Sequence, residues 1–386
     1  MDFSKVRVLV MDGGGKQTLA MVRGLKEIGC YVSVLCSTKM DACYTSNKPD
    51  EKIVNPILPL RDEETLKFLL DLVSKGNKYD VLMPIGELST NFVTEHESEF
   101  RKYVRLACAP RETYIKAFNK QITFDKAIES GIPCPYTRHS KQDIEEYLNT
   151  CRFPIIIKPR QGLGSIGFHK FEKKEDFWPY MKEKGLDPDD FVVQEFVAFE
   201  KRIGTNLFVD QKGNICTSYA VDVLRWFPID AGSGVLIVTV DAHEVLQYAG
   251  KLLQKLDWKG FANVAFMVDK ETGEPRLLEI NGRIPQSVKM AFMCGCNVAE
   301  QMLEMAYDED VIRYPENDKY GLYIRHFDTD LAWFLKSPNR FTTKPSWFTW
   351  KNTQEILFSK DDKKPFWSHL LLKVFRYKET MKRKKH

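Results

Sequence analysis

One stretch near the middle of the chain decides the fold: Phe153-Pro-Ile-Ile-Ile-Lys158-Pro-Arg160-Gln-Gly162-Leu-Gly164-Ser165-Ile-Gly167-Phe-His169. It contains G-x-G-x-x-G from Gly162 to Gly167, which is the spacing of the dinucleotide-binding fingerprint. That fingerprint needs a helix directly after the loop, whose N-terminus holds the pyrophosphate. Here the following residues, Phe168–Phe171, have a strand pattern instead. The pattern therefore favours a flexible glycine loop between two antiparallel strands.

A glycine loop of this kind can bind phosphate groups. Its backbone N–H groups can fold over phosphates, and the hydroxyl of Ser165 adds a donor. Lys158, near the end of the first strand, directs a cation to the same place. An ordinary hairpin with a long loop is the alternative, because glycine is common in turns.

Two further motifs carry groups that suit a nucleotide. Asn119-Lys120 lies on a predicted helix and supplies a second lysine. The predicted strand Val192–Val197 contains the polar pair Gln194-Glu195, followed by apolar residues. Such a segment offers backbone groups to the edge of an adenine ring and apolar surface to its face. Glu200 lies just beyond, within reach of ribose hydroxyls.

A metal-binding pattern follows in Leu277-Leu-Glu279-Ile-Asn281-Gly-Arg283. Glu279 and Asn281 are two residues apart on a predicted strand, so their side chains share one face. Carboxylate and amide oxygens suit Mg²⁺, which takes hard oxygen ligands together with nucleotide phosphates. Arg283, on the same face, is a fixed cation for a transferring phosphoryl group.

The order of these motifs resembles the ATP-grasp superfamily, to which carbamoyl phosphate synthetase, biotin carboxylase and D-alanine–D-alanine ligase belong. The resemblance covers about Val6 to Glu304. Residues 257–283 look most like the carboxylate–amine ligase branch, and the four-part order makes the match specific.

The resemblance implies a role for each motif residue. The α- and β-phosphates of ATP are bound by Lys120 and Lys158, under a loop that includes Gly162, Gly164 and Ser165. The adenine and ribose are bound by Gln194, Glu195, Phe196, Val197 and Glu200. Mg²⁺, with Mn²⁺ as a second candidate, is bound by Glu279 and Asn281. The transferred phosphate is stabilised by Arg283, and the acyl phosphate or substrate is contacted by Arg225, for which a surface arginine beside an aromatic ring is the alternative.

One position departs from the family pattern. The family usually has a second acidic or amide metal ligand on the strand before the Glu-x-Asn strand, and by spacing that position is Ala265. Alanine cannot bind a metal. Three explanations stay open. Glu279 and Asn281 bind the metal together with water, a nearby residue replaces the missing ligand, or the site is slow or inactive.

The fold expected from these patterns is α/β followed by α+β. Alternating strand and helix signals in the first residues predict an open parallel sheet. The resemblance implies a Rossmann-like pre-ATP-grasp domain at 1–112, an ATP-grasp domain at 113–310 with a lid lobe at about 133–195, and a small C-terminal extension with a basic tail at 311–386.

Individual elements can be predicted as well. Apolar spacing predicts one helix at Lys16–Gly29 and another at Tyr114–Ser130. Two strands, Ala262–Val268 and Arg276–Ile280, are predicted to form a hairpin through the turn 270–273. Gly13-Gly14-Gly15 lies between a strand and a helix, and a tight turn is favoured there over a phosphate site.

Composition limits the partners. The chain has 386 residues, 28% of them charged, and a net charge of +4, which gives no electrostatic case for nucleic acid. Nine cysteines without a CxxC pair favour free thiols in a reducing cytoplasm. No apolar stretch is long enough to span a bilayer. The basic run Lys382–Lys385 allows weak contact with a membrane surface, and a homodimer is compatible with the sequence.

These inferences predict an ADP-forming carbon–nitrogen ligase. It would activate a small-molecule carboxylate as an acyl phosphate and couple it to an amine. Two alternatives stay open: an enzyme that activates bicarbonate, like carbamoyl phosphate synthetase or biotin carboxylase, and a non-catalytic nucleotide-binding protein.

Overall fold

The first sheet of the structure is parallel and lies at the N-terminus. The computed structural model describes residues 2–55, 63–76, 78–162, 167–229 and 232–383. The sheet has the strand order β3-β2-β1-β4-β5. Its strands are β1 (Arg7–Val10), β2 (Tyr31–Cys36), β3 (Glu51–Val54), β4 (Val81–Met83) and β5 (Arg105–Leu106). The accompanying helices are α1 (Lys16–Glu27), α2 (Ala42–Thr45), α3 (Glu63–Ser74), α4 (Glu87–Glu95) and α5 (Glu97–Phe100).

The central strands of this sheet are apolar because helices cover both faces. Val8, Leu9 and Val10 of β1 are fully buried, as are Val81 and Leu82 of β4. The predicted helix at Lys16–Gly29 is confirmed as α1, which ends two residues earlier. The predicted parallel sheet is therefore present.

A small antiparallel sheet, in the order β6-β9-β7-β8, carries the glycine loop. Its strands are β6 (Thr137–Arg138), β7 (Ile155–Pro159), β8 (His169–Phe171) and β9 (Phe191–Glu195), packed with α8 (Lys141–Thr150) and α9 (Phe177–Glu183). Ile155 pairs with Phe171 and Ile157 pairs with His169. The predicted antiparallel pair on either side of the glycine loop is thus confirmed.

The third sheet has seven strands in the order β14-β13-β10-β11-β12-β15-β16. They are β10 (Phe199–Val209), β11 (Ile215–Phe227), β12 (Ser233–Val240), β13 (Gly260–Asp269), β14 (Pro275–Asn281), β15 (Tyr323–Arg325) and β16 (Thr353–Glu355). The helices that follow its strands are α10 (His243–Lys255), α11 (Lys289–Cys294), α12 (Val298–Ala306), α13 (Phe327–Lys336) and α14 (Lys364–Arg383). The predicted β13–β14 hairpin is confirmed, and β15 and β16 show that residues beyond 311 contribute to the same sheet.

The single helix predicted at Tyr114–Ser130 is wrong. The structure divides it into α6 (Arg111–Phe118) and α7 (Lys120–Glu129). Asn119 between them is extended, with φ −91° and ψ 107°, and its side chain accepts a hydrogen bond from the backbone N–H of Gln121. Tertiary contact explains the break, because the N–H of Lys120 donates to the carbonyl of Arg160, 2.9 Å away, at the end of β7.

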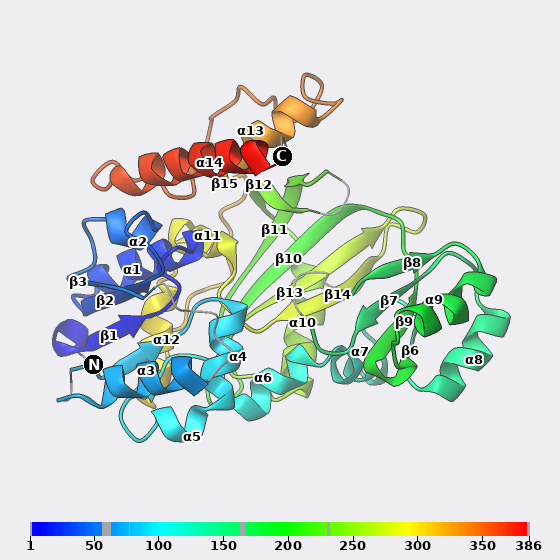
Figure 1. The fold of residues 1–386 in the computed structure, drawn as a ribbon, viewed down its shortest axis with the longest axis horizontal. Coiled ribbons are helices and arrows are strands. Elements are labelled where there is room, and N and C mark those ends of the chain that lie inside the picture. The colour runs from blue at the N-terminus through cyan, green and yellow to red at the C-terminus, as the bar shows by residue number, and fades with distance from the viewer. Residues whose placement is uncertain (1, 56–62, 77, 163–166, 230–231, 384–386) are drawn as a thin grey trace.

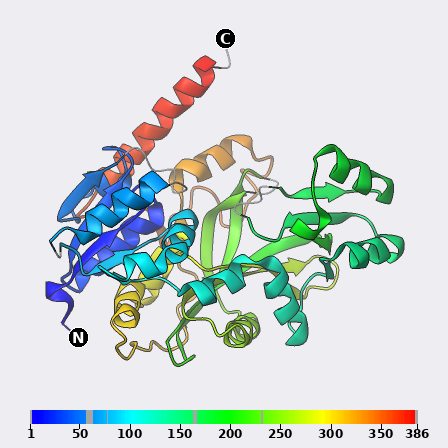
Figure 2. The same ribbon diagram turned by 60° about the horizontal axis from the view of Figure 1, so that its bottom comes forward.

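The three sheets lie side by side. In Figure 1 the parallel sheet is at the left, the long strands β10, β11 and β13 cross the centre, and the small sheet is at the right. Figure 2 shows that the C-terminal half of α14 runs out from the body of the molecule. In this arrangement β4, β7, β10 and β14 each have one end near the centre of the molecule, where motif residues lie.

Candidate functional site

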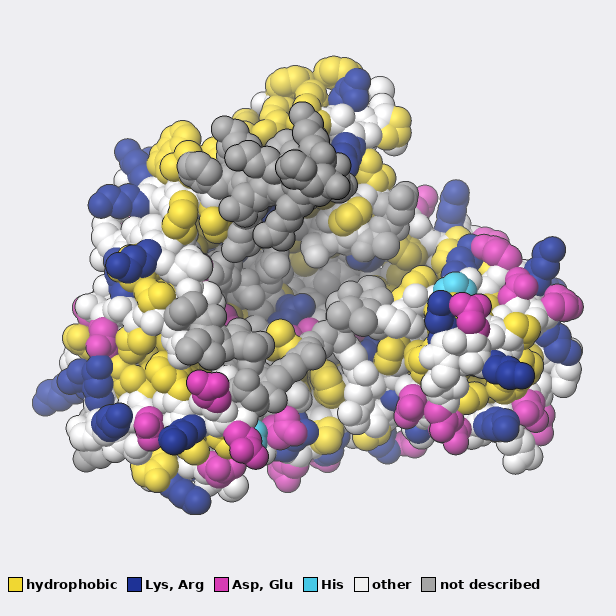
Figure 3. All heavy atoms as spheres, in the orientation of Figure 1, with side chains coloured by type: hydrophobic (Ala, Val, Ile, Leu, Met, Phe, Trp, Pro, Cys, Tyr) yellow, Lys and Arg dark blue, Asp and Glu magenta, His cyan; other side chains and the backbone are white. Residues whose placement is uncertain are grey.

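A cavity of about 480 Å³ lies where the parallel sheet, α7 and the seven-stranded sheet meet. In Figure 3 the molecular face is hollowed near its centre, and charged side chains are visible inside. Its polar lining residues come from distant parts of the sequence: Glu87, Lys120, Thr123, Gly162, Arg202, Ser233, Asn263, Glu279, Asn281, Arg283, Gln286 and Ser287. The structure thus brings together the lysine, glycine and Glu-x-Asn-x-Arg motifs.

Lys120 lines this cavity, and Lys158 lies close enough to Lys120 and Glu279 for their charges to shift its pKa. Lys120 is the first residue of α7, and its Nζ is 3.4 Å from the carbonyl oxygen of Gly162. Burial lowers the pKa of Lys120, and burial lowers that of half-buried Lys158 to about 8. Glu279 opposes both shifts, and the charge of Lys120 lowers the pKa of Lys158 further. An anionic ligand such as a polyphosphate would offset the repulsion between the two ammonium groups.

The carboxylate of Glu279 and the amide of Asn281, both on β14, face the motif lysines. Glu279 is exposed, and its Oε1 accepts a 3.2 Å hydrogen bond from Nδ2 of Asn281. Ala265 pairs directly with Glu279 across β13 and β14, and Gly204 of β10 pairs with Ala265. Small residues therefore leave space beside Glu279. Asn263 pairs with Asn281 and is the nearby polar residue that can substitute for a ligand at position 265.

Three more charged groups complete the lining. Arg283 lies 3.3 Å from Oδ1 of Asn281 and 3.9 Å from a carboxylate oxygen of Glu87. Burial raises the pKa of Glu87, with Arg283 opposing the shift. Burial lowers the pKa of Arg202, whose Nη2 donates to the carbonyl of Gly232 and whose Nε has no partner among the described residues. The arginines therefore keep donors available for an anionic ligand.

The residues predicted to bind adenine and ribose lie along β9 and its continuation. Gln194 is buried and donates to Oγ1 of Thr137, while Glu195 accepts hydrogen bonds from Arg276 and from the N–H of Tyr136. Val197 is buried, and Phe196 and Glu200 are exposed. The side chains of the Gln-Glu pair thus hold the strand, and the N–H groups of Glu195 and Phe196 donate to the carbonyls of Tyr136 and Pro154. Gly164 and Ser165 lie outside the described residues.

The structure does not place Arg225 in this cavity. Its side chain is 2% exposed, and Nη1 donates to both carboxylate oxygens of Asp330 at 3.0 Å. Arg325 also pairs with Asp330 at 3.1 Å, and Trp333 lies against Arg225 at 5.0 Å. The predicted catalytic role of Arg225 therefore has no support from the geometry, because the guanidinium is committed to a buried ion pair. The alternative of a surface arginine is wrong as well.

Sequence reasoning did not identify Arg202, Glu87 or Asn263. Glu87 follows β4 directly after Pro84-Ile85-Gly86, and ligands of parallel sheets bind at the carboxyl ends of strands. The position of Glu87 after a strand of the parallel sheet could therefore have identified it from the sequence. Arg202 and Asn263 become site residues only through the register of β10 and β13, which the sequence does not determine.

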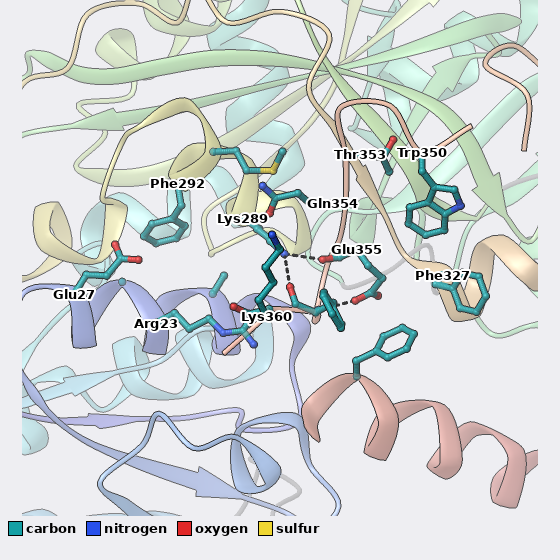
Figure 4. Close-up of a pocket in the computed structure, with 16 residues that line it drawn as sticks. Arg23, Glu27, Lys289, Phe292, Phe327, Trp350, Thr353, Gln354, Glu355 and Lys360 are labelled. Atoms are coloured by element: carbon teal, nitrogen blue, oxygen red, sulfur yellow. Dashed lines mark hydrogen bonds between the residues drawn. The ribbon is translucent and has the colours of Figure 1, made fainter. Parts of the chain in front are cut away.

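A second cavity, of about 860 Å³, lies between α1, α11 and the residues around β16. Figure 4 shows Lys289 at its centre, with Arg23 and Glu27 on one side and Phe327 and Trp350 on the other. Burial and the neighbouring Arg23 lower the pKa of Lys289 to about 8. Its Nζ donates to the carbonyls of Glu355 and Phe358, at 2.6 and 3.1 Å. This larger cavity holds none of the predicted motif residues.

The first cavity fits Mg²⁺ only together with a nucleotide. Glu279 and Asn281 are hard oxygen donors on one face, but the described residues contain no group of three or more His, Cys, Asp or Glu side chains that could hold a metal. Mg²⁺ commonly uses one or two protein carboxylates and completes its shell with phosphates and water. The donor set matches that type of site.

Known proteins resemble this chain over much of its length. Over 264 residues it is 22% identical to the N-terminal section of the carbamoyl phosphate synthase large chain of Methanopyrus kandleri, covering 65% of this chain and 43% of that protein. Over 268 residues it is 23% identical to the D-aspartate ligase of Enterococcus faecium, covering 64% of this chain and 63% of that protein. The chain thus spans less than two thirds of either relative.

The fold has a counterpart among solved structures. The biotin carboxylase domain of the Hydrogenobacter thermophilus 2-oxoglutarate carboxylase, solved with MgADP, ADP and bicarbonate, superposes with a TM-score of 0.65 at 16% identity, over 82% of this chain and 73% of that chain. Residues 117–287 match the family model of the ATP-grasp domain. The predicted resemblance is confirmed, because residues 117–287 match the ATP-grasp domain model and the fold matches that of the biotin carboxylase domain.

Proposed function

We propose that this protein is an ATP-dependent ligase that activates a carboxylate as an acyl phosphate and couples it to an amine. One observation carries the proposal. Lys120, Arg202 and Arg283 surround Glu279 and Asn281 in a single cavity, and Lys158 lies beside them. Cations around a carboxylate–amide pair suit a metal-bound polyphosphate and the charge of a transferring phosphoryl group.

In this proposal the chain's own residues position and neutralise charge. Lys120 and Lys158 hold the α- and β-phosphates, and Arg202 and Arg283 orient the γ-phosphate and the substrate carboxylate. Mg²⁺ bound by Glu279 and Asn281 would neutralise phosphate charge. A carboxylate oxygen attacks the γ-phosphorus and ADP leaves. The amine nitrogen then attacks the acyl carbon, the C–O bond to phosphate breaks, and the nitrogen loses a proton. Positioning supplies most of the rate in such transfers.

Glu87 is the residue that binds the amine in this scheme. It is the first residue of α4, lies 3.9 Å from Arg283 and lines the same cavity. A half-buried carboxylate beside Arg283 can attract a cationic amine and accept a hydrogen bond from it. The N-terminal sheet thus contributes a substrate-binding group to the ATP-grasp site.

A substrate screen tests the proposal. Purified protein is incubated with MgATP and mixtures of carboxylic acids and amines, and ADP and phosphate release are measured. Release that requires an acid plus an amine supports the ligase. Release with bicarbonate alone favours a bicarbonate-activating enzyme, and nucleotide binding without turnover in any mixture favours a non-catalytic protein. We also propose that the protein acts in the cytoplasm, accepts Mn²⁺ in place of Mg²⁺, and forms a homodimer.

A further inference from the structure

The C-terminal segment, residues 311–386, differs in charge from the rest of the chain. It contains 17 Lys and Arg against 8 Asp and Glu, a net charge of +9, so that residues 1–310 carry a net charge of −5. The excess persists where side chains are described. Residues 335–373 contain exposed lysines spread along the whole stretch: Lys336, Lys344, Lys351, Lys360, Lys363, Lys364 and Lys373.

The acidic side chains of residues 335–373 do not neutralise this excess. Asp362 is buried and pairs with Arg23 of α1, and Asp361 pairs with Lys48. The carboxylate of Glu355 accepts from the backbone N–H groups of Leu357 and Phe358. All three carboxylates are thus engaged within the molecule. The seven lysines are exposed, and Lys373 also lies 3.7 Å from a carboxylate oxygen of Asp328.

The same segment exposes large apolar side chains. Phe341 is 71% exposed, Phe348 65% and Trp367 57%. Seven exposed side chains form what we call the aromatic surface: Leu335, Phe341, Phe348, Trp350, Phe358, Trp367 and Leu371. In Figure 3 hydrophobic side chains gather at the top of the molecule, over the region where Figure 1 places α13, with Lys or Arg side chains among them.

Ring contacts make the aromatic surface continuous. Phe334 links Phe341 and Phe348, with centroids 5.5 and 5.8 Å apart. Phe327 lies 6.2 Å from Trp350 and 6.1 Å from Phe366, which in turn contacts Phe358 and Trp367 at 6.0 and 5.1 Å. Trp347 lies within 6.4 Å of both Phe327 and Phe334 and connects the two groups. One connected layer of rings therefore supports the exposed side chains of α13, the loop after it and the start of α14.

A contiguous apolar surface of this kind indicates a binding site rather than a solvated face. Water is a poor solvent for exposed phenylalanine, whereas aromatic rings and lysines together suit the interface of a bilayer that carries negative charge. Long lysine side chains can hold their ammonium groups at the level of lipid phosphates while rings enter the acyl boundary. No helix among the described residues is long and apolar enough to cross a membrane, so the contact would be peripheral.

We propose that the aromatic surface of the C-terminal segment docks this protein on an anionic membrane. The occupant is a lipid surface because the complementary charge must be negative and extended, matching lysines distributed over α13, the following loop and α14. Residues 335–373 carry the proposal, and the terminal basic run adds charge to it. The first half of α14 is anchored to the body, since the hydroxyl of Ser368 donates to the carbonyl of Met40 and His369 contacts Asp328.

Sedimentation with vesicles tests the proposal. The full chain is mixed with vesicles of phosphatidylcholine alone or of phosphatidylcholine with phosphatidylserine, at low and high salt. We expect binding to the anionic vesicles only, weakened by salt because the attraction is screened. The double variant Phe348→Ser/Trp367→Ser should reduce the partition coefficient at least about tenfold, because it removes two interfacial rings. Lys363→Glu/Lys364→Glu should reduce it about tenfold as well, since each lysine contributes electrostatic attraction near a charged surface.

A matched control uses an exposed ring elsewhere. Tyr103 is 49% exposed and lies between α5 and β5 of the N-terminal sheet, so Tyr103→Ser should leave vesicle binding unchanged. Thermal unfolding of each variant shows that it is folded. Absence of wild-type binding, equal binding to neutral vesicles, or an equal loss in Tyr103→Ser would overturn the proposal. So would a wild-type dimer, seen by light scattering, that Phe348→Ser/Trp367→Ser dissociates while vesicle binding is absent.

Discussion

The two cavities described above contain similar charged groups and use them differently. In the cavity of about 480 Å³, the closest contacts of Lys120 and Arg283 with other side-chain or carbonyl oxygens are long, at 3.3 to 3.9 Å. In the cavity of about 860 Å³, Lys289 and Arg23 donate to backbone carbonyls at 2.6 to 3.1 Å and 2.9 Å. Lys120 and Arg283 of the first cavity thus make only long contacts, whereas Lys289 and Arg23 of the second hold backbone segments together.

The proposed nucleotide site is therefore identified by the contacts of its charged groups and not by the volume of its cavity. Lys158 and Lys289 both have a pKa of about 8 because of burial, so a perturbed pKa does not separate them. The hydrogen-bond partners of the two lysines do separate them, because two backbone carbonyls already accept hydrogen bonds from Lys289. Arg283 and Lys158 can each be compared with a similar residue that the structure places elsewhere.

The largest effect is expected on turnover, from Arg283→Ala. Loss of a fixed cation beside the transferring phosphoryl group should lower kcat by about a hundred- to a thousandfold. Arg225→Met is the control, because Arg225 is buried against Asp330, which keeps its pair with Arg325. That variant should lower the unfolding temperature but leave kcat of the folded protein nearly unchanged. Equal losses of kcat in both would show that Arg283 has no special place in the reaction.

A large effect is expected on nucleotide affinity, from Lys158→Ala. Removing a charge that pairs with phosphate should weaken MgATP binding about a hundredfold, as measured by isothermal titration. Lys289→Ala should instead lower stability by about 1–3 kcal/mol, because two buried carbonyls lose their donor, and should leave the affinity for MgATP unchanged. Wild-type affinity in Lys158→Ala would place the phosphates elsewhere.

A smaller effect is expected on the pH dependence of binding. The pKa of Lys158 is about 8 in the nucleotide-free protein, and phosphate favours its charged form. As pH rises above about 8, the free protein must take up a proton to bind, so affinity should fall by up to about tenfold per pH unit. Titrations in buffers of different ionisation enthalpy should show this proton uptake. Lys158→Arg, whose charge persists, should remove it, and uptake that remains in Lys158→Arg would assign it to another group.

The smallest effect is expected from Ala265→Glu. Ala265 lies opposite Glu279 and next to Gly204, so a carboxylate there has room to share a metal ion. Without metal the two acids repel, and the variant should be less stable than the wild type. MgATP should then stabilise the variant by about 1 kcal/mol more than it stabilises the wild type, because binding to the folded state adds stability. A thermal shift no larger than that of the wild type would show that position 265 does not face the metal.

Most of the proposed nucleotide site was predictable from the sequence, because its candidate residues lie in short local patterns. Lys158 before the glycine loop and Glu279 with Asn281 on one strand face are set by local period and order. Arg202 and Asn263 could not be predicted, since only the pairing of β10 and β13 brings them to the cavity. Arg225 was misplaced for a related reason. Asp330, its partner, lies far along the chain, and no local pattern reveals a long-range ion pair.

Helix boundaries show the same limit. The apolar spacing of α6 and α7 is continuous, and the break at Asn119 arises from a hydrogen bond to the strand end at Arg160. That break sets Lys120 at the first turn of α7, next to Gly162. The position of Lys120, which we propose binds phosphate, thus depends on a tertiary contact that local sequence does not encode.

A structure with Mn²⁺ and a non-hydrolysable ATP analogue tests the central claim most directly. Mn²⁺ can be located by anomalous scattering, independently of the nucleotide. The account predicts a Mn²⁺ peak about 2 Å from oxygens of Glu279 and Asn281, with the phosphates between that ion and the ammonium groups of Lys120 and Lys158. A Mn²⁺ peak away from Glu279, or phosphates bound at Lys289 in the second cavity, would contradict it.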